Sequence, residues 1–555
     1  MTRASPAPAA TTVFPARKIL TMNPAQPQAS CVAVRDGRIL AVGSAEEVAG
    51  WGAHETDSRF AGKVLMPGLV EGHSHLMEGG FWKYAYVGYH DRRGPDGRLW
   101  KGLRSFDAVV ERLSEFERGM RDPAEPLLAW GFDPIYFGAT RMTTRELDRV
   151  SGTRPIAVLH ASIHLLNVNT AMLRRAGIEA HTQVEGIARY PDGSPSGELQ
   201  EFAAMFPVMR AIGNAFARGG MTEDGLWRFG RIAALAGVTT ATDMLSDWRQ
   251  ESVENLARVT AHEDFPVRIV SAYRDLDAPS ETENGLRRLE ELRPASTDKL
   301  RFSLVKLVVD GSIQGFTARL RWPGYYNGRP NGIWIVAPAA LAAAVERFHA
   351  AGAQLHIHTN GDEATEVALD ALEGALARHP RPDHRHTLQH CQMADAAQFR
   401  RMARLGVCVN LFANHIYYWG DVHYAQTMGP DRANRMDACG SAQRFGVPFA
   451  IHSDAPITPL GPLFTAWCAV NRLTASGRVL GSGERIEVPQ ALSAITLGAA
   501  YTLTMDHEIG SIEVGKRADF CVLEDDPLAL APQRLKDARV WGTVLAGKVF
   551  EAPHA

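Results

Sequence analysis

The residues best suited to chemistry are histidines, one lysine and one aspartate that follow short apolar segments in the middle of the chain. His73 and His75 lie in the segment LVEGHSHL, separated by one serine. Because alternate side chains of an extended strand share a face, both imidazoles would point the same way. Imidazole nitrogens are common ligands of divalent metals. The pair therefore predicts a metal site, against the simpler alternative of ordinary packing in a chain with 20 histidines.

Similar residues recur near the ends of later apolar segments. They are Lys306 in LVKLVVDG, His356 and His358 in HIHTNG, His390 in LQHCQ and Asp454 in IHSDAP. Lysine is rarely buried without a partner, so its place within an apolar segment is informative. Each residue alone has a simpler explanation, such as a hydrogen-bonded histidine or an aspartate that caps a loop. Together they predict a ligand set for a borderline-soft divalent metal.

Eight strand–helix units in the middle of the chain could bring these residues together. The predicted strands are residues 64–75, 237–244, 266–273, 302–311, 353–361, 386–392, 406–412 and 447–455. Helical stretches rich in Ala, Leu and Glu separate them, which is typical of parallel βα units. We therefore predict an α/β fold, a TIM (β/α)8 barrel, whose active residues lie at the C-terminal ends of its strands.

Both ends of the chain are β-rich. The segment SCVAVRDGRILAVG alternates on either side of Asp36-Gly37, which is a hairpin signal. We predict a small composite β-sandwich domain from residues 1–65 plus 510–555, and a barrel domain over 66–509. Residues from about 81 to 231 are too many for one connection, so we expect a large insertion after the first barrel strand, over the barrel mouth.

Composition excludes several classes of function. The net charge is −3 and no basic block is present, which argues against nucleic acid or an anionic membrane as partner. No apolar stretch approaches the roughly 20 residues of a membrane span, and the N-terminus lacks the apolar core of a secretory signal. Six cysteines without a CxxC pair indicate free thiols and a cytoplasmic location. A small-molecule substrate is the expected partner; a homo-oligomer stays open, because no segment identifies an interface.

Five motifs together resemble the amidohydrolase superfamily. They are MPGLVEGHSH, VKLVVDGS, HIHTNGDEA, LQHCQ and IHSDAP. The resemblance is closest to family 3 of that superfamily, the group that includes N-substituted formamide deformylases. RPIAVLHASIHLLNVNTAMLRRAGI and YPDGSPSGELQE within the insertion, and GSIEVGKRADF near the C-terminus, are similar to the same family.

The resemblance implies a centre with two divalent ions, with Zn²⁺ as the default metal. The implied ligands are His73, His75 and Asp454 for one ion, His358 and His390 for the other, and Lys306, N6-carboxylated, as the bridge between them. Carboxylation would turn a buried cation into an anion that two nearby metal ions stabilise. The family pattern favours His358 over His356, because it places the ligand just before a Gly-Asp turn, here Gly361-Asp362.

The implied reaction is hydrolysis of an amide-type C–N bond in an N-acyl or N-formyl amine. A metal-activated hydroxide would attack the carbonyl, while Asp454 serves as general base and then general acid. His164, in ASIHLLNVN, matches a family histidine near the substrate and would polarise the carbonyl. Aromatic segments indicate an apolar or aryl substrate, whose predicted contacts are His415, Tyr417, Trp419, Trp130 and Phe132.

Three alternatives remain at this stage. Ester or carbamate hydrolysis differs only in the leaving group. A deaminase with one metal on the same fold would dispense with the bridging lysine, so Lys306 counts against it. From another class, the chain could be a non-catalytic barrel that serves as a scaffold. Such a barrel should have lost ligands, whereas all six positions are filled here.

Overall fold

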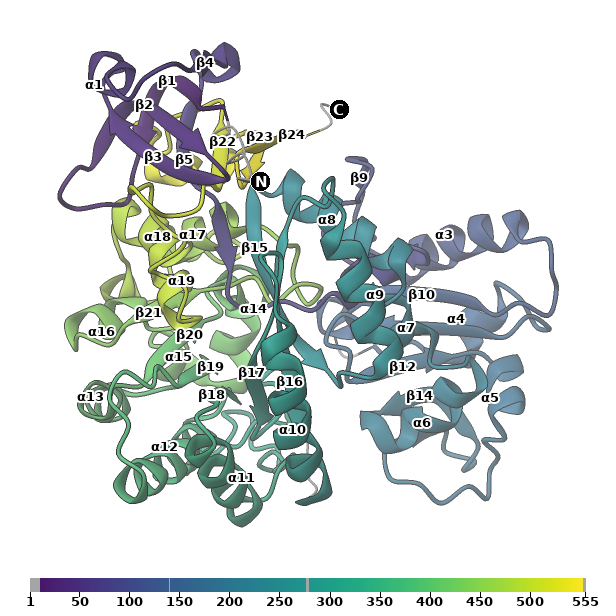
Figure 1. The fold of residues 1–555 in the computed structure, drawn as a ribbon. Helices are drawn as coiled ribbons and strands as arrows, with labels where there is room; N and C mark the ends of the chain where they lie inside the picture. The colour runs from purple at the N-terminus through teal and green to yellow at the C-terminus, as the bar shows by residue number, and fades with distance from the viewer. Residues whose placement is uncertain (1–9, 139, 276–278, 553–555) are drawn as a thin grey trace.

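The centre of the protein is one sheet of eight parallel strands (Figure 1). The computed structural model describes residues 10–138, 140–275 and 279–552. The strand order is β21-β20-β19-β18-β17-β16-β15-β6. Their bounds are β6 (Leu69–Glu71), β15 (Val238–Ser246), β16 (Arg268–Asp275), β17 (Leu300–Val308), β18 (Gln354–Thr359), β19 (Thr387–His390), β20 (Cys408–Leu411) and β21 (Phe449–Ile451). Each overlaps one predicted strand. A parallel bridge between Ser74 and Ala455 connects the segments that follow the two outermost strands, so the sheet curls. The predicted α/β fold with a parallel sheet is confirmed.

Alternation along the strands separates an inner from an outer apolar layer. On β16, Val270 and Ala272 belong to the cluster inside the curled sheet, whereas Ile269 and Tyr273 pack toward the surrounding helices. The helices of this outer layer are α8 (Glu223–Leu235), α9 (Gln250–Ala261), α10 (Pro279–Leu292), α11 (Pro338–Ala350), α12 (Asp362–Arg378), α13 (Ala396–Leu405), α16 (Cys439–Arg444), α17 (Pro462–Asn471) and α18 (Val488–Ala494). This two-layer packing fixes which residues of each strand face the interior.

The two ends of the chain meet in a second sheet, of eight strands. Its main order is β24-β23-β22-β5-β1-β2-β3, and β4 pairs with β1. The strands are β1 (Thr12–Leu20), β2 (Gln28–Arg35), β3 (Arg38–Gly43), β4 (Glu55–Thr56), β5 (Val64–Pro67), β22 (Phe520–Leu523), β23 (Val540–Leu545) and β24 (Lys548–Glu551). The predicted Asp36-Gly37 hairpin is confirmed, with both residues at positive φ. Arg268, which is fully buried, links the two sheets through a 2.6 Å ion pair with Asp519.

A third sheet lies between β6 and β15, in the segment where an insertion was expected. Its order is β13-β14-β12-β11-β10-β7. The strands are β7 (Ala85–Tyr86), β10 (Leu127–Phe132), β11 (Ile156–His160), β12 (Leu165–Val168), β13 (Ile187–Arg189) and β14 (Pro195–Gln200), and the helices are α2 (Met77–Phe81), α3 (Phe106–Gly119), α4 (Thr144–Asp148), α5 (Thr170–Ala176), α6 (Glu201–Ala211) and α7 (Ala215–Gly219). Glycines hold α2 directly against α8: a Cβ on Gly79 would lie 1.9 Å from the Gly225 carbonyl oxygen. The segment after His75 is therefore closely packed.

Two further expectations concern the cysteines and membrane-spanning segments. All six cysteines are buried and free. Across the part of the chain that the structure describes, no helix combines the length and apolarity that a membrane crossing requires.

Candidate metal centre

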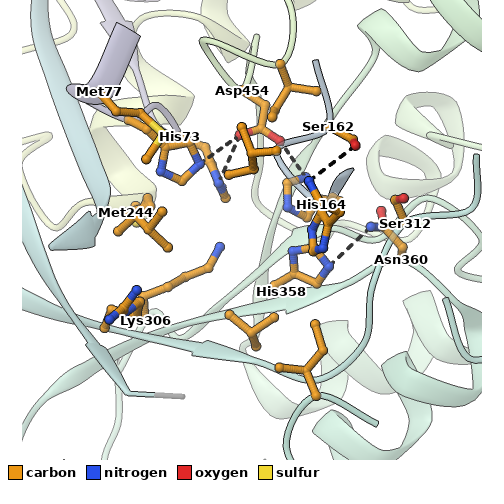
Figure 2. Close-up of a pocket in the computed structure, with 18 of the residues that line it drawn as sticks. His73, Met77, Ser162, His164, Met244, Lys306, Ser312, His358, Asn360 and Asp454 are labelled. Carbon is orange, nitrogen blue, oxygen red and sulfur yellow. Dashed lines mark hydrogen bonds and ion pairs between the residues drawn. The ribbon is translucent and has the colours of Figure 1, made fainter. Parts of the chain in front are cut away.

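The predicted metal ligands gather in one cavity of about 220 Å³ at the carboxyl ends of the central strands (Figure 2). All six predicted ligands are among the residues that line it: His73, His75, Lys306, His358, His390 and Asp454. The segment between β6 and β15 supplies much of the remaining wall, with Met77, Phe81, Phe202, Met205, Met209 and Phe216. Residues spread over nearly the whole chain therefore meet around one space.

Asp454 lies at the centre of the imidazoles. Its Oδ1 atom is 3.3 Å from Nε2 of His73 and 3.1 Å from Nε2 of His75. Its Oδ2 atom is 3.9 Å from Nδ1 of His390. His73, His75 and Asp454 are all buried and can place ligand atoms within 4.8 Å of one another. This geometry is that of a group that could hold a metal ion.

His358 and His390 form the neighbouring side of the cluster. Their ring centroids are 4.5 Å apart, and the ring of His73 lies 4.7 Å from that of His390. Burial, and then the charge of Lys306, lowers the pKa of His358 to about 3. Burial also holds the pKa values of His73 and His390 well below the usual range. Neutral imidazoles are the form that binds metals.

Lys306 is buried, and its amine has no hydrogen-bond partner among the described residues. Burial lowers the pKa of the amine to about 7, although the charge of Asp454 opposes that shift. The charge of Lys306 in turn lowers the pKa values of His73, His358 and His390, and Figure 2 shows its amine directed toward the imidazoles. An isolated amine in such a place is costly; carboxylation or a bound ion would remove the cost.

Gln389 orients the imidazoles, and the sequence reasoning missed it. Its Oε1 atom accepts a 2.7 Å hydrogen bond from Nδ1 of His73, which leaves Nε2 of His73 free for a ligand. Its Nε2 atom donates to Nδ1 of His356 at 2.6 Å. His356 is therefore committed to Gln389 through that nitrogen, whereas His358 faces the cavity. The position of Gln389, directly before His390, was the available signal.

Hydrogen bonds and left-handed backbone conformations fix the segments that carry two of the predicted ligands, Asp454 and His390. Ser453 donates from its backbone N and its hydroxyl to the carboxylate of Glu71, at 2.9 and 2.8 Å, which joins the first and last strands. Burial raises the pKa of Glu71 to about 8, against those hydrogen bonds. Asp454 and His390 both adopt left-handed backbone conformations, with φ of 53° and 67°. Strained conformations of this kind persist where the surrounding structure fixes them, often at functional sites.

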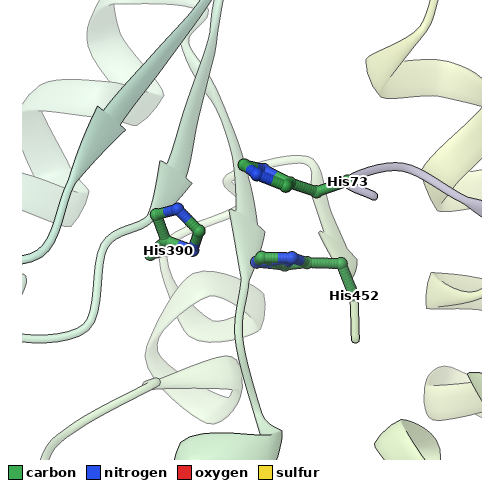
Figure 3. Close-up of side chains that lie close together, drawn as sticks. All are labelled: His73, His390 and His452. Carbon is green, nitrogen blue, oxygen red and sulfur yellow. The ribbon is translucent and has the colours of Figure 1, made fainter. Parts of the chain in front are cut away.

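His452 is a further imidazole that the sequence reasoning missed (Figure 3). It is fully buried, stacks on His73 with 4.7 Å between ring centroids, and lies 5.0 Å from the ring of His390. Neither of its ring nitrogens has a hydrogen-bond partner among the described residues. His73, His390 and His452 form a second group whose ligand atoms lie within 4.8 Å of one another. His452 directly follows β21, two residues before Asp454, and this position was the available signal.

The unpaired polar atoms in this cluster fit a bound metal. Nδ1 of His75, Nδ1 of His390, Nζ of Lys306 and both ring nitrogens of His452 are buried without a hydrogen-bond partner among the described residues. Buried polar groups are ordinarily satisfied, so this concentration calls for a bound group. The donors are nitrogen and carboxylate oxygen, the set that zinc and similar metals prefer.

His164 and His415 both line the cavity. His164 lies close enough to His358 to contribute to the lowering of the His358 pKa. Its Nδ1 atom lies 3.0 Å from Oε2 of Glu201. His415 lines the cavity, with Nδ1 3.4 Å from Oδ1 of Asp437, and burial lowers its pKa to about 3. Both histidines therefore have a carboxylate that orients the ring.

The other predicted substrate contacts lie elsewhere. Trp130 and Phe132 belong to two separate apolar clusters of the third sheet, and Trp419 donates to Asp133 at 3.1 Å. Tyr417 packs against Trp467, with 5.8 Å between ring centroids. None of these four residues is among the described residues that line the cavity. The sequence showed that they were aromatic, but not which of several apolar cores they would join.

This placement makes two alanine variants behave differently. Trp130→Ala should cost about 3–5 kcal/mol of unfolding free energy, because it empties a buried core. Phe202 is 56% exposed and lines the cavity. The Phe202→Ala variant should therefore lose little free energy of unfolding but should have a higher KM. Urea unfolding and steady-state kinetics of both variants check this. Equal stability of the two variants would contradict the placement.

Comparison with known proteins agrees with this site. The sequence model described as the amidohydrolase family matches residues 61–550. The chain is 27% identical over 549 residues to the putative amidohydrolase YtcJ of Bacillus subtilis, covering 96% of this chain and 97% of that protein. It is also 27% identical over 546 residues to the N-substituted formamide deformylase of Arthrobacter pascens, covering 94% of each.

Solved structures share the fold. An uncharacterized metal-dependent hydrolase from Pyrococcus horikoshii OT3 superposes with a TM-score of 0.70 at 19% identity, covering 94% of this chain and 99% of that one. The family match extends over most of the sequence, and members of this family are metal-dependent. The chain therefore belongs to the amidohydrolase family and is a metal-dependent hydrolase that acts on carbon–nitrogen bonds.

Proposed function

We propose that the protein hydrolyses the amide-type C–N bond of N-acyl or N-formyl amines. The observation that carries the proposal is the convergence of four imidazoles, Lys306 and the Asp454 carboxylate on one cavity with an apolar wall. The N-substituted formamide deformylase to which the chain is similar over 94% of its length supports the same bond type. In this proposal the central sheet is a TIM (β/α)8 barrel, residues 1–65 and 510–555 form a β-sandwich domain, and residues 81–231 are an insertion over the barrel mouth.

The proposed ligands divide between two divalent ions, with Zn²⁺ as the first choice. His73, His75 and Asp454 would hold one ion, His358 and His390 the other, and carboxylated Lys306 would contact both. Such ions lower the pKa of water and polarise a carbonyl. The six free thiols suit a reducing compartment such as the cytoplasm.

The protein's own residues would then move the proton and position the substrate. Asp454, at the centre of the imidazoles, would accept a proton from water on a carboxylate oxygen and deliver it to the leaving nitrogen. His164, whose Nδ1 atom lies against Glu201, would in its doubly protonated form donate a hydrogen bond from Nε2 to the oxygen that gains negative charge. The methionine and phenylalanine wall would exclude water from the acyl or amine group.

His452 is a proposed additional donor to this centre. His452→Phe keeps the ring volume and removes both nitrogens, so it should lower metal affinity about 10–100-fold, the effect typical of groups that support a metal site. Metal titration by calorimetry measures this, with His349→Phe as a histidine control outside the cavity. Unchanged metal affinity in His452→Phe would exclude His452 from the centre.

A substrate screen tests the proposed reaction. N-formyl and N-acyl derivatives of aniline and benzylamine are incubated with the metal-loaded protein, and amine release is measured beside ester and carbamate analogues. We expect amine release that disappears after chelation. Faster cleavage of the esters would favour the esterase alternative, and ammonia release with one ion per chain would favour a deaminase. A protein that purifies without metal, has Lys306 unmodified and shows no turnover after metal is added would favour a scaffold.

A further inference from the structure

Among the described residues that line the cavity, Arg274 is a cation that the proposed metal centre does not use. Arg274 lies near the carboxyl end of β16, in register with Lys306 on β17. Val270 and Ala272 of the same strand face the interior, so alternation turns Arg274 inward as well. The residue is half-buried and lines the cavity.

Arg274 has no hydrogen-bond or ion-pair partner among the described residues, and its Nε atom is fully buried. Much of the wall of the same cavity is apolar, with Phe81, Met244 and Ile335 among the lining residues. Guanidinium groups in such surroundings are normally paired, because an unpaired charge out of water is costly. The absence of a partner therefore points to a ligand.

The carboxylates of the cavity are already engaged. Among the described lining residues they are Asp310 and Asp454. Asp310 accepts three hydrogen bonds of 2.9 Å from the backbone N–H groups of Arg319, Asn360 and Gly361. Asp454 lies among the imidazoles. Neither carboxylate forms a hydrogen bond or ion pair with Arg274, so a carboxylate of the substrate could pair with it.

We propose that Arg274 is a specificity-determining residue that binds a carboxylate of the substrate. The inference rests on the proposed C–N hydrolysis and names its substrate class: N-acyl amines that carry one carboxylate beside an apolar group. The planar guanidinium can form two parallel hydrogen bonds with a carboxylate, which gives both affinity and orientation. The apolar wall takes the remainder of the substrate.

A matched substrate pair tests the inference by kinetics. N-formylphenylalanine and N-formyl-2-phenylethylamine differ only in the carboxylate. We expect wild-type kcat/KM to be about 100-fold higher for the acid. Arg274→Met should remove most of that preference and leave the neutral substrate within about threefold, while Arg274→Lys keeps part of it because it retains the charge without the fork. An unchanged preference in Arg274→Met would overturn the inference.

A binding measurement separates this inference from the proposed reaction. Calorimetry compares 3-phenylpropionate with 3-phenylpropanol on the metal-loaded wild type and on Arg274→Met. We expect the substitution to weaken binding of the acid at least about tenfold and to leave the alcohol unaffected. If acid binding is the same in both proteins, the inference is wrong. If it depends on Arg274 while neither formyl compound is hydrolysed, the carboxylate site stands and the proposed reaction fails.

The stability of the ligand-free protein distinguishes a ligand-binding role of Arg274 from a purely structural one. Because Arg274 has no partner among the described residues, Arg274→Met should leave the melting temperature unchanged or raise it. A large loss of stability would instead show that Arg274 supports the fold, and would count against the inference.

Discussion

Asp454→Asn should reduce kcat about 10²–10⁴-fold, the range that loss of a general acid–base group produces. Asparagine keeps the shape of the side chain and one ligand oxygen, but it cannot accept and return a proton. Metal content should therefore stay close to that of the wild type, while turnover of N-formyl amines is lost. Steady-state kinetics and elemental analysis of the same preparation measure both effects.

The control for this variant is Asp454→Glu, which retains the carboxylate but displaces it relative to His73 and His75. It should keep more activity than the asparagine variant if proton transfer is the lost function. Full activity in Asp454→Asn would refute the proton-transfer role. Loss of activity together with loss of metal would show that Asp454 acts mainly as a ligand.

Lys306→Ala should lose metal and about 10³-fold or more in activity, because the bridging group is absent. The lowered pKa of about 7 leaves a large neutral fraction of the amine near neutral pH. Only the neutral amine can form an N–C bond to carbon dioxide, with release of one proton. Native mass spectrometry of the wild type should show the added mass of one carbon dioxide, and labelled bicarbonate should give a carbamate carbon signal.

Rescue by small carboxylates distinguishes a bridging anion from a structural lysine. Acetate or propionate can enter the space left in Lys306→Ala and supply the missing carboxylate, so part of the metal binding and activity should return. Lys306→Met fills that space and should not respond. Equal rescue of both variants, or unmodified lysine in a fully active wild type, would contradict the carboxylated bridge.

Much of the fold was accessible from sequence because its signals are local. The β-branched segments and the helical stretches between them located all eight parallel strands, and Asp36-Gly37 located a hairpin. The alternation of His73 and His75 was equally direct. The expectation of a composite terminal domain came from two similar β-rich ends, and in the structure β5 pairs with β22.

The features that the sequence did not predict depend on long-range packing. Trp130 and Phe132 are aromatic, as residues that line a substrate pocket often are, but they are buried in two apolar clusters of the third sheet. Gln389, His452 and Arg274 acquire their meaning only from what surrounds them: two imidazoles for Gln389, and the lack of a partner for the other two. A single sequence does not reveal whether a polar side chain is satisfied.

The most direct test of the account is metal content and activity measured on the same samples. Protein treated with a chelator should lose both, and stepwise return of Zn²⁺ should restore hydrolysis of an N-formyl amine up to about two ions per chain. His73→Asn and His390→Asn should each reduce the number of ions bound. Full activity in protein stripped of metal, or unchanged metal content in both variants, would contradict the central claim that these residues form a catalytic metal centre.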